Sequence, residues 1–142
     1  MCGIFGCVLH DGNTAAPLIR SALKRLEYRG YDSIGQVTVN GGRLYVKKDR
    51  GRLEEVHSKY NLDDMPGSVG VGHTRWATHG RPAQENAHPH MDCKARIAVV
   101  HNGIIENYVD IKRELEGKGH QFQSRTDTEI VPHLIEQYLK KE

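Results

Sequence analysis

Met1-Cys2-Gly3-Ile4-Phe5-Gly6 opens the chain, and the rest of the sequence is organised around it. A cysteine directly after the initiator Met is small enough for that Met to be trimmed, which would leave Cys2 with a thiol and a free α-amine. An α-amine titrates at about 7.7–8.0 and a thiol at about 8.5, so the amine can accept the thiol proton at neutral pH. One residue would then supply both nucleophile and base. The simpler interpretation is an ordinary first strand that begins Met-Cys.

The same stretch predicts the first strand of the fold. Its apolar residues, Ile4, Phe5, Val8 and Leu9, indicate a strand that leads inward. The glycines at positions 3 and 6 would let the backbone near the terminus pack tightly or approach a ligand.

Length, charge and cysteine content limit the class of protein. A chain of 142 residues suffices for one domain with a single core. The net charge of +2 gives no electrostatic reason to expect nucleic acid or a membrane surface as a partner. No apolar run approaches the ~18 residues of a membrane span, and the first residues lack the features of a signal peptide. We therefore expect a cytoplasmic protein whose three cysteines are free thiols.

Helical spacing and turn signals organise the first half of the chain. Apolar residues over 18–26 predict an amphipathic helix, with Asn13 or Thr14 as its N-cap and Gly30 as its C-cap. Alternation over 36–39 and 44–47, around Asn40-Gly41-Gly42, predicts a hairpin. A short helix is expected over 52–60.

In the second half, two buried strands are predicted over 68–73 and 97–101, and each runs into a polar loop. A helix follows Asn107 and stops at Gly117-Lys118-Gly119, a short strand covers 121–123, and the last helix begins near Ile130. The pattern predicts mixed α and β structure with helices on the faces of the sheets. Chemistry is expected in the loops at the strand ends.

Four features together supply the parts that acyl transfer from an amide requires. A thiolate attacks the carbonyl, and the side-chain amide of Asn102 and the N–H of Gly103 can meet the developing oxyanion. For an amino-acid substrate, Arg75 can bind the α-carboxylate bidentately and Asp127 can bind the α-ammonium. Taken singly, the residues have simpler roles: a surface ion pair, a tight turn and a helix cap. Their combination with Cys2 favours catalysis.

Histidines make a metal site the competing interpretation. The segment from His88 through His90 to Cys93 offers three ligands, to which His73, His79 or His101 would have to add a fourth. No second pair of Cys or His ligands with a matching spacing accompanies this segment, so we predict no metal site. His79 and His101 are better explained as hydrogen-bonding residues that position their loops.

Six blocks, in order over essentially the whole chain, resemble the glutaminase domain of the isomerising glutamine-fructose-6-phosphate aminotransferase family. They are Cys2-Gly3-Ile4, Glu27-Tyr28-Arg29-Gly30-Tyr31-Asp32-Ser33, Gly72-His73-Thr74-Arg75-Trp76-Ala77-Thr78-His79-Gly80, Asn86-Ala87-His88-Pro89-His90, His101-Asn102-Gly103-Ile104-Ile105-Glu106-Asn107 and Thr126-Asp127-Thr128-Glu129. Other class II amidotransferases share Cys-Gly-Ile but differ in the loops.

The resemblance implies an α+β fold, the four-layer α/β/β/α sandwich of the N-terminal-nucleophile hydrolases. It implies that Cys2 is the nucleophile and that its freed amine is the base. Asn102 and the Gly103 N–H would form the oxyanion hole.

The resemblance also implies how the substrate is held. Arg75 and Asp127 match the residues that bind the carboxylate and the ammonium of glutamine. The loop that closes over glutamine, which would exclude water and retain ammonia, matches Trp76, Thr78 and His79.

Members of that family continue well past the position of Glu142. Residues 2–142 are therefore expected to form the N-terminal part of a type 2 glutamine amidotransferase domain, with the sandwich incomplete on its C-terminal side. The sugar isomerase domains that bind fructose 6-phosphate are absent from this chain. We expect L-glutamine as substrate, no metal, no organic cofactor, no nucleic-acid or membrane partner, and a homo-oligomer for the complete protein.

The leading hypothesis is hydrolysis of glutamine to glutamate and ammonia by Cys2, as the amide-donor half of an enzyme that makes glucosamine 6-phosphate for UDP-N-acetylglucosamine synthesis. Two alternatives stay open. The chain is either a catalytically idle fragment or glutamine-binding module, or a class II amidotransferase with a different acceptor.

Overall fold

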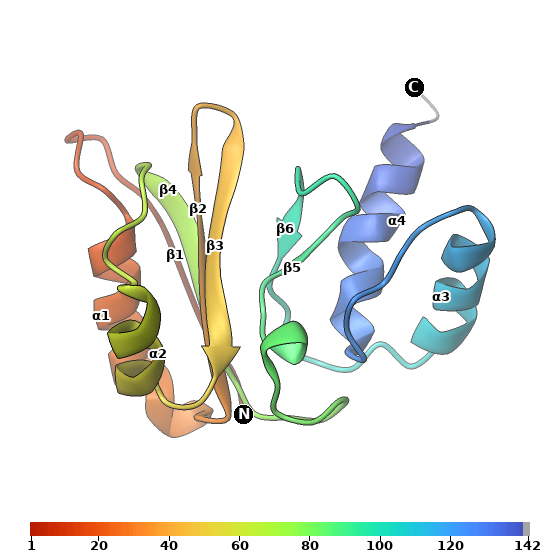
Figure 1. The fold of residues 1–142 in the computed structure, drawn as a ribbon, viewed down its shortest axis with the longest axis horizontal. Coiled ribbons are helices and arrows are strands. Elements are labelled where there is room, and N and C mark those ends of the chain that lie inside the picture. Colours follow the sequence, from red (N-terminus) through yellow and green to blue (C-terminus); the bar gives the residue numbers. More distant parts are fainter. Residues whose placement is uncertain (141–142) are drawn as a thin grey trace.

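The computed structural model describes residues 1–140, which form four layers (Figure 1). Two helices cover a four-stranded sheet, a small two-stranded sheet lies on its other side, and two more helices form the outer layer. The strands are β1 (Gly3–Val8), β2 (Ser33–Asn40), β3 (Arg43–Arg50), β4 (Val69–Arg75), β5 (His90–Met91) and β6 (Ala98–Val99). The helices are α1 (Ala16–Leu26), α2 (Leu53–Tyr60), α3 (Tyr108–Gly117) and α4 (Ile130–Leu139). The layer order is the one predicted for the sandwich.

The register of the large sheet brings three distant parts of the chain to one edge. The strand order is β1-β4-β2-β3, and every neighbouring pair is antiparallel. Gly3 pairs with Thr74, and Ser33 pairs with Arg75. The start of the chain therefore lies beside the end of β4 and the start of β2.

The apolar core lies between α1, α2 and the large sheet. Ile19 and Leu23 of α1 are fully buried against the sheet, as the helical spacing predicts. They belong to one buried cluster, which consists of Ala15, Ile19, Leu23, Ile34, Leu53, Val56 and Leu62. This layer supports the sheet from behind and leaves its other face to the second half of the chain.

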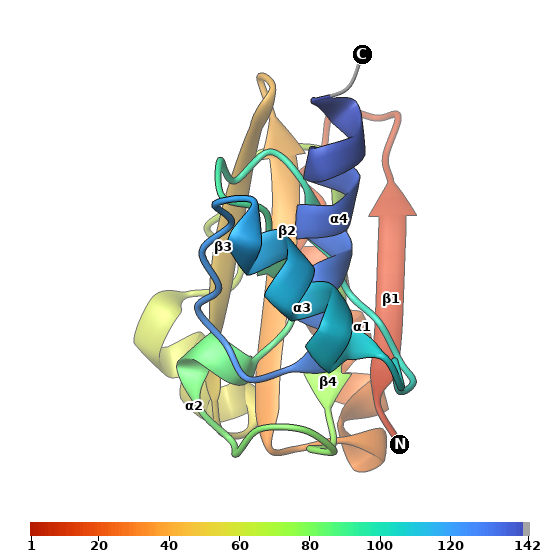
Figure 2. The same ribbon diagram turned by 90° about the vertical axis from the view of Figure 1, so that its right-hand side faces the viewer.

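The contact between the large sheet and the second half is polar and close. Buried residues of this region include His73, His88 and His90. Gly35 of β2 is needed because a Cβ there would lie 1.8 Å from the carbonyl oxygen of His88. In Figure 2, α3 and α4 lie in front of the strands on this side.

Several predicted elements are confirmed, notably the hairpin, the helix α2 and the start of α4 at Ile130. The predicted strand over 97–101 is shorter, because only Ala98–Val99 pair with another strand. The strand predicted over 121–123 is wrong, since those residues form no strand.

The predicted N-cap of α1 is wrong, and the predicted C-cap, Gly30, instead ends the 3-10 turn that directly follows the helix. The N-cap is Ala15, with no side-chain cap, and the Asn13 side chain donates to Asp11 at 2.7 Å. At the other end, Gly30 is extended, with φ −175°, and follows a 3-10 turn over Glu27–Arg29. Glycine is required there by space, since a Cβ would lie 2.6 Å from the Arg75 carbonyl carbon.

Strand alternation limits what β1 buries. Phe5 and Cys7 pack on the core cluster, whereas Ile4 and Val8 are 41% and 61% exposed on the opposite face. The predicted strand is therefore confirmed, and only one of its faces packs on the core cluster. No helix among residues 1–140 combines the length and the apolar character that crossing a bilayer requires.

Candidate active site

A cavity of about 410 Å³ lies at the sheet edge where the chain begins. Every residue predicted for catalysis or substrate binding lines it, namely Cys2, Arg75, Trp76, Thr78, His79, Asn102, Gly103 and Asp127. Other lining residues include Met1, Arg29, His88, His101, Ile104, Thr126 and Thr128. The fold thus gathers side chains that are up to 125 positions apart, from Cys2 to Asp127.

Cys2 is fixed by its neighbours on β4. The Trp76 N–H donates to Cys2 Sγ at 3.1 Å, and the Gly3 N–H donates to the Thr74 hydroxyl at 3.0 Å. Because the pairing of β1 with β4 sets these contacts, the position of the thiol follows from the sheet register. Met1 is 80% exposed and is therefore accessible to a processing enzyme.

Asn102 and Gly103 follow β6 and lie beside Cys2. Asn102 Nδ2 donates to the backbone carbonyl oxygen of Cys2 at 3.0 Å. Gly103 has φ +144°, a conformation that strongly favours glycine. A side-chain amide and a backbone N–H are thus brought next to the cysteine from a segment about one hundred residues away.

His73 orients Asn102 and was missed as a site residue by the sequence analysis. Its Nε2 lies 2.9 Å from Asn102 Oδ1, and its side chain is buried. Burial is the main cause that lowers the pKa of His73 to about 4, so the imidazole is neutral at pH 7. The sequence signals were its place in a quoted motif and its position in β4, two residues before Arg75.

Arg75 is buried and organises the loop that follows β4. Its guanidinium donates to the backbone carbonyls of His79, Gly80 and Arg81, the last two at 2.9 and 3.3 Å. Asp32 Oδ1 lies 3.9 Å from Arg75 Nη1. The alternative interpretation of Arg75 as a surface ion-pair partner does not fit, since its side chain is only 4% exposed.

The loop over residues 76–81 is tied to the sheet by a second residue, Asp32. Asp32 Oδ2 accepts the N–H of Ala77, and its Oδ1 accepts the Ser33 hydroxyl at 2.9 Å. Trp76 remains half exposed and packs edge-on against Tyr31, with ring centroids 5.5 Å apart. Sequence reasoning did not assign this anchoring role to Asp32, although the residue falls within a quoted motif.

Asp127 anchors the other wall of the cavity. It is buried, and its Oδ2 accepts the Ile105 N–H at 2.7 Å. His101 Nδ1 lies 3.2 Å from the Thr128 hydroxyl, which links the same two segments. His101 thus positions its loop through its side chain. His79 lies against Tyr108, with ring centroids 5.3 Å apart.

The histidines considered as metal ligands are not brought together as a site. His88 stacks on His73 with ring centroids 4.1 Å apart, and His90 Nε2 lies 2.7 Å from the Thr126 hydroxyl. Burial is the main cause that lowers the pKa of both His88 and His90, and that of His90 falls to about 3. Cys93 faces other partners, His120, His133 and Glu136, which sequence reasoning missed. Within residues 1–140, these four form the group that can hold a metal ion.

The arrangement has a clear chemical capacity. A thiol and an amide donor meet at one end of the cavity, and a buried cation and a buried carboxylate line its walls. Such a cavity suits an α-amino acid whose own charges are matched by Arg75 and Asp127 and whose side-chain carbonyl reaches Cys2.

Comparison with protein families gives a match to the glutamine amidotransferase domain over residues 48–141. Curated relatives cover nearly all of this chain. The glutamine–fructose-6-phosphate aminotransferase [isomerizing] of Methanothermobacter thermautotrophicus is 56% identical over 139 residues, which are 98% of this chain and 23% of that protein. The enzyme of the same name from Sulfurisphaera tokodaii is 53% identical over 142 residues, 99% of this chain and 24% of that protein. The chain thus spans about a quarter of the length of these relatives.

Solved structures agree on the fold. The glutamine phosphoribosylpyrophosphate amidotransferase from B. subtilis, complexed with ADP and GMP, superposes with a TM-score of 0.79 and 31% identity, over 94% of this chain and 29% of that chain. A structure described as the allosteric regulatory enzyme of purine biosynthesis matches with the same TM-score, identity and coverage. These structural neighbours confirm the predicted α+β fold class.

Proposed function

Because the chain belongs to the glutamine amidotransferase domain family, we propose that its cavity binds L-glutamine and that Cys2 hydrolyses the side-chain amide to glutamate and ammonia. Residues 2–142 then form the N-terminal part of a type 2 glutamine amidotransferase domain. Arg75 holds the α-carboxylate of the substrate and Asp127 holds its α-ammonium. Trp76, Thr78 and His79 belong to the loop that covers it.

The first half of the reaction forms a thioester. After Met1 is removed, the α-amine of Cys2 accepts the thiol proton, and the thiolate attacks the amide carbon of glutamine. Asn102 Nδ2 and the Gly103 N–H donate to the oxyanion of the tetrahedral intermediate. The C–N bond then breaks, and the ammonium of Cys2 returns the proton to the leaving nitrogen, which departs as ammonia.

The second half releases glutamate. A water molecule gives a proton to the α-amine and attacks the thioester carbonyl, and the same two donors stabilise the new oxyanion. The C–S bond breaks, the thiolate regains a proton, and glutamate leaves. The net reaction consumes glutamine and water and yields glutamate and ammonia, with no redox change and no cofactor required.

The observation that carries the proposal is the contact of Asn102 with Cys2. Asn102 Nδ2 lies 3.0 Å from the carbonyl oxygen of Cys2, and it has two N–H donors. One is used in this contact, and the other is available beside the nucleophile. A donor in this place is what acyl transfer by Cys2 needs.

The acceptor of the ammonia is inferred from the relatives. Identity to the named glutamine–fructose-6-phosphate aminotransferases is 53–56%, against 31% to the phosphoribosylpyrophosphate amidotransferase structure. We therefore propose that ammonia is delivered to fructose 6-phosphate to give glucosamine 6-phosphate. The sugar site would belong to sugar isomerase domains outside these 142 residues.

The test is the intact mass of the purified chain before and after treatment with 6-diazo-5-oxo-norleucine, a glutamine mimic that alkylates the nucleophile. We expect a mass without Met1 and one adduct, which peptide mapping assigns to Cys2. Cys7→Ser is the matched control, because Cys7 is the half-buried thiol of the same strand and its replacement should leave labelling intact.

Cys2→Ser should abolish both the adduct and glutamate release from glutamine. Retention of Met1 would contradict the proposed mechanism, since no free amine would then be available as the base. An adduct that maps to Cys7 or Cys93 would contradict the assignment of the nucleophile.

A further inference from the structure

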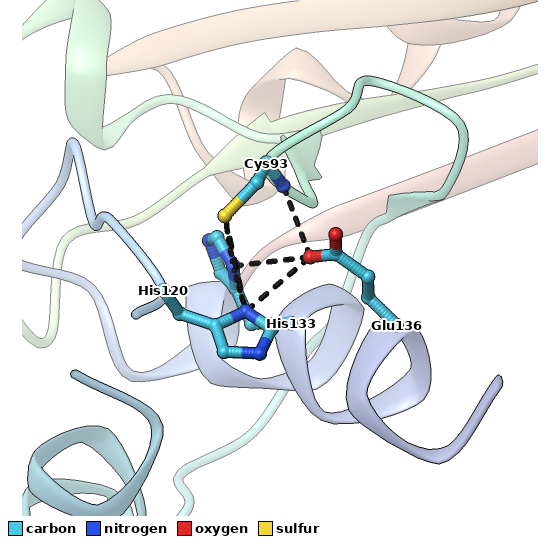
Figure 3. A group of neighbouring side chains, drawn as sticks. All are labelled: Cys93, His120, His133 and Glu136. Carbon is cyan, nitrogen blue, oxygen red and sulfur yellow. Dashed lines mark hydrogen bonds and ion pairs between the residues drawn. The ribbon is translucent and has the colours of Figure 1, made fainter. Parts of the chain in front are cut away.

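A second cluster of reactive side chains lies away from the cavity, on the helical side of the second half. Cys93 sits in the turn between β5 and β6, and His120 follows the end of α3. His133 and Glu136 come from α4, where a spacing of three residues puts them on one face. Figure 3 shows the four side chains pointing toward a common centre.

The four ligand atoms are close and mutually spaced. His120 Nδ1 lies 3.1 Å from His133 Nδ1, and Cys93 Sγ lies 3.8 and 3.5 Å from these two nitrogens. Glu136 Oε2 lies 3.3 Å from His120 Nδ1 and 3.9 Å from His133 Nδ1. All four atoms lie within 4.8 Å of one another.

These separations match a tetrahedral zinc site. Zinc bonds of about 2.0–2.2 Å to nitrogen and oxygen and about 2.3 Å to sulfur imply ligand-to-ligand distances of about 3.3–3.6 Å in a tetrahedron. Five of the six ligand-to-ligand separations, from 3.1 to 3.9 Å, bracket that range, and the sixth, from Cys93 Sγ to the Glu136 oxygen, is at most 4.8 Å. Cys, His and carboxylate are also the ligand types that zinc prefers in proteins.

The outer ring nitrogens of both histidines are held by acceptors. His133 Nε2 lies 3.3 Å from Glu129 Oε2, and His120 Nε2 lies 3.0 Å from Gln137 Oε1. Because a carboxylate or amide oxygen accepts, each Nε2 carries the proton, and each Nδ1 of a neutral imidazole presents a lone pair. Partners of this kind orient the histidines of known metal sites.

Two nitrogen lone pairs 3.1 Å apart repel each other unless a proton or a metal ion lies between them. A carboxylate oxygen and a sulfur face the same centre, and the side chains of His120, His133 and Glu136 are at most 1% exposed. Glu136 Oε1 has no hydrogen-bond partner, and Lys140 Nζ lies 3.5 Å from it. The Cys93 N–H donates to Glu136 Oε2 at 3.4 Å, so this N–H and Lys140 compensate only the carboxylate, and the convergence of the two nitrogens and the sulfur favours a bound dication.

We propose that Cys93, His120, His133 and Glu136 bind one Zn²⁺. With four protein ligands the site is closed, so its role is structural and not catalytic. The ion would join the β5–β6 turn, the segment after α3 and α4. The inference is independent of the proposed glutaminase activity, and it departs from the expectation of no metal drawn from the sequence.

Entry to the site is available from a second cavity. Cys93, His133 and Glu129 are among the residues that line it, and Cys93 is the exposed member of the cluster. Zinc can therefore reach the thiolate first and then the buried ligands.

The experiment measures metal in the untagged 142-residue chain after gel filtration. We expect one zinc per chain, removed by a strong chelator with loss of thermal stability and restored by added zinc. Reconstitution with Co²⁺ should give the d–d bands of a tetrahedral site and a thiolate-to-cobalt charge-transfer band. A chain that binds no metal would overturn the proposal.

Single substitutions test whether the zinc ion binds at this cluster. Cys93→Ser should remove the charge-transfer band and His133→Asn should release the zinc, whereas Cys7→Ser and the exposed His10→Asn are controls that should retain both. Glu129→Gln alters an outer partner of His133 and keeps an amide oxygen as acceptor for the N–H groups of Gln123 and Ser124, and it should lower zinc affinity about 10–100-fold. A band that survives Cys93→Ser but is lost in Cys2→Ser would overturn the proposal, because the metal would then sit at the terminal cysteine.

A measurement on the natural chain tests the proposal even if a variant does not fold. Alkylation of Cys93 in the natural chain should be much slower with zinc than after chelation, while alkylation of Cys7 serves as the internal reference. Equal rates for Cys93 with and without zinc would contradict the assignment of its thiolate as a ligand.

Discussion

His73 Nε2 lies 2.9 Å from Asn102 Oδ1, and this contact decides which end of the Asn102 amide faces Cys2. The Cys2 carbonyl can only accept, so the Asn102 atom 3.0 Å from it is the donor Nδ2. The amide oxygen therefore faces His73, whose Nε2 must carry a proton. A neutral His73 in one tautomer thus presents the N–H donors of Asn102 to the nucleophile.

The first prediction concerns stability in acid. Burial lowers the pKa of His73 from 6.5 to about 4, so below pH 6.5 the unfolded chain binds a proton that the folded chain does not. Stability is therefore lost as pH falls. Between pH 7 and pH 5, His73 should cost about 2 kcal/mol of unfolding free energy. His73→Gln keeps an N–H donor for Asn102 but cannot titrate, so urea unfolding should show a smaller loss over this range.

The groups that face His73 are the same in the variant, namely His88, His101 and Arg75. Their contributions cancel in the comparison with the natural chain except for the coupling of His88 to His73, since His73 helps to lower the pKa of His88. The exposed His10→Gln is the control and should leave the acid dependence unchanged. An equal pH dependence in His73→Gln would show that another group causes the acid loss.

The second prediction separates catalysis from binding at Asn102. Asn102→Ala removes one of the two proposed oxyanion donors, and such a loss typically costs about 10²–10³ in kcat. The KM for glutamine should change little, because Asn102 is not proposed to contact the amino-acid end of the substrate. Steady-state glutamate release measures both constants. A rise in KM with unchanged kcat would place Asn102 in ground-state binding instead.

The third prediction uses Arg75→Lys to test substrate binding, as Asn102→Ala tests catalysis. The Arg75 side chain donates to the carbonyls of Gly80 and Arg81 as well as to the proposed substrate carboxylate, and a lysine cannot reproduce this planar geometry. Loss of a charge-assisted bidentate contact of about 1.5–3 kcal/mol should raise KM about 10- to 100-fold. Unchanged KM in the kinetic assay would contradict the role of Arg75 in glutamine binding.

Local signals in the sequence were sufficient for much of the fold. The hairpin followed from Asn40-Gly41-Gly42 between alternating residues, and α1 followed from the spacing of Ile19 and Leu23. The same reasoning failed over 121–123, where an alternating pattern has no neighbouring strand to pair with. It also failed at Asn13, because its nearby Asp11 competes with the helix end for the side chain.

Some residues of the candidate site were predicted from the sequence, and others were missed. Cys2, Asn102 and Asp127 were predicted because their chemistry and their motifs stand out in the sequence, and the structure brings them to one cavity. Their roles stay predictions. Asp32 was missed because its importance depends on the register of β4 against β2, which no local pattern encodes. His73 was missed because its importance depends on where the segment with Asn102 packs on β4. His120 and His133 were missed for the same reason, since they converge only when α4 packs beside the end of α3.

Gly35 tests how the two halves fit together. A Cβ at this position would lie 1.8 Å from the His88 carbonyl oxygen, so Gly35→Ala must push the second half away from β2. We expect a loss of about 1–3 kcal/mol or more in urea unfolding. Gly117→Ala is the matched control, because a Cβ there meets nothing within 4 Å and should stabilise α3 slightly. Equal effects of the two substitutions would contradict a close contact at Gly35.

Lys48 gives a prediction with the same sign of pH dependence but in the alkaline range. Its Nζ donates to the carbonyls of Ala87 and Pro89 at 2.7 and 2.8 Å, and burial lowers its pKa from 10.5 to about 8 despite the opposing charges of Glu129 and Glu85. Between those two values the unfolded chain binds more protons than the folded chain, so stability rises with pH. From pH 7 to pH 9.5 the gain in unfolding free energy from Lys48 should be about 1–2 kcal/mol.

Urea unfolding of Lys48→Met should show no such gain. Lys47→Met is the control and should retain it, because Lys47 lies on the same strand but donates to the carbonyls of residues 60, 61 and 64. If the stability gain persists in Lys48→Met, burial of the Lys48 ammonium between the two halves is not its cause.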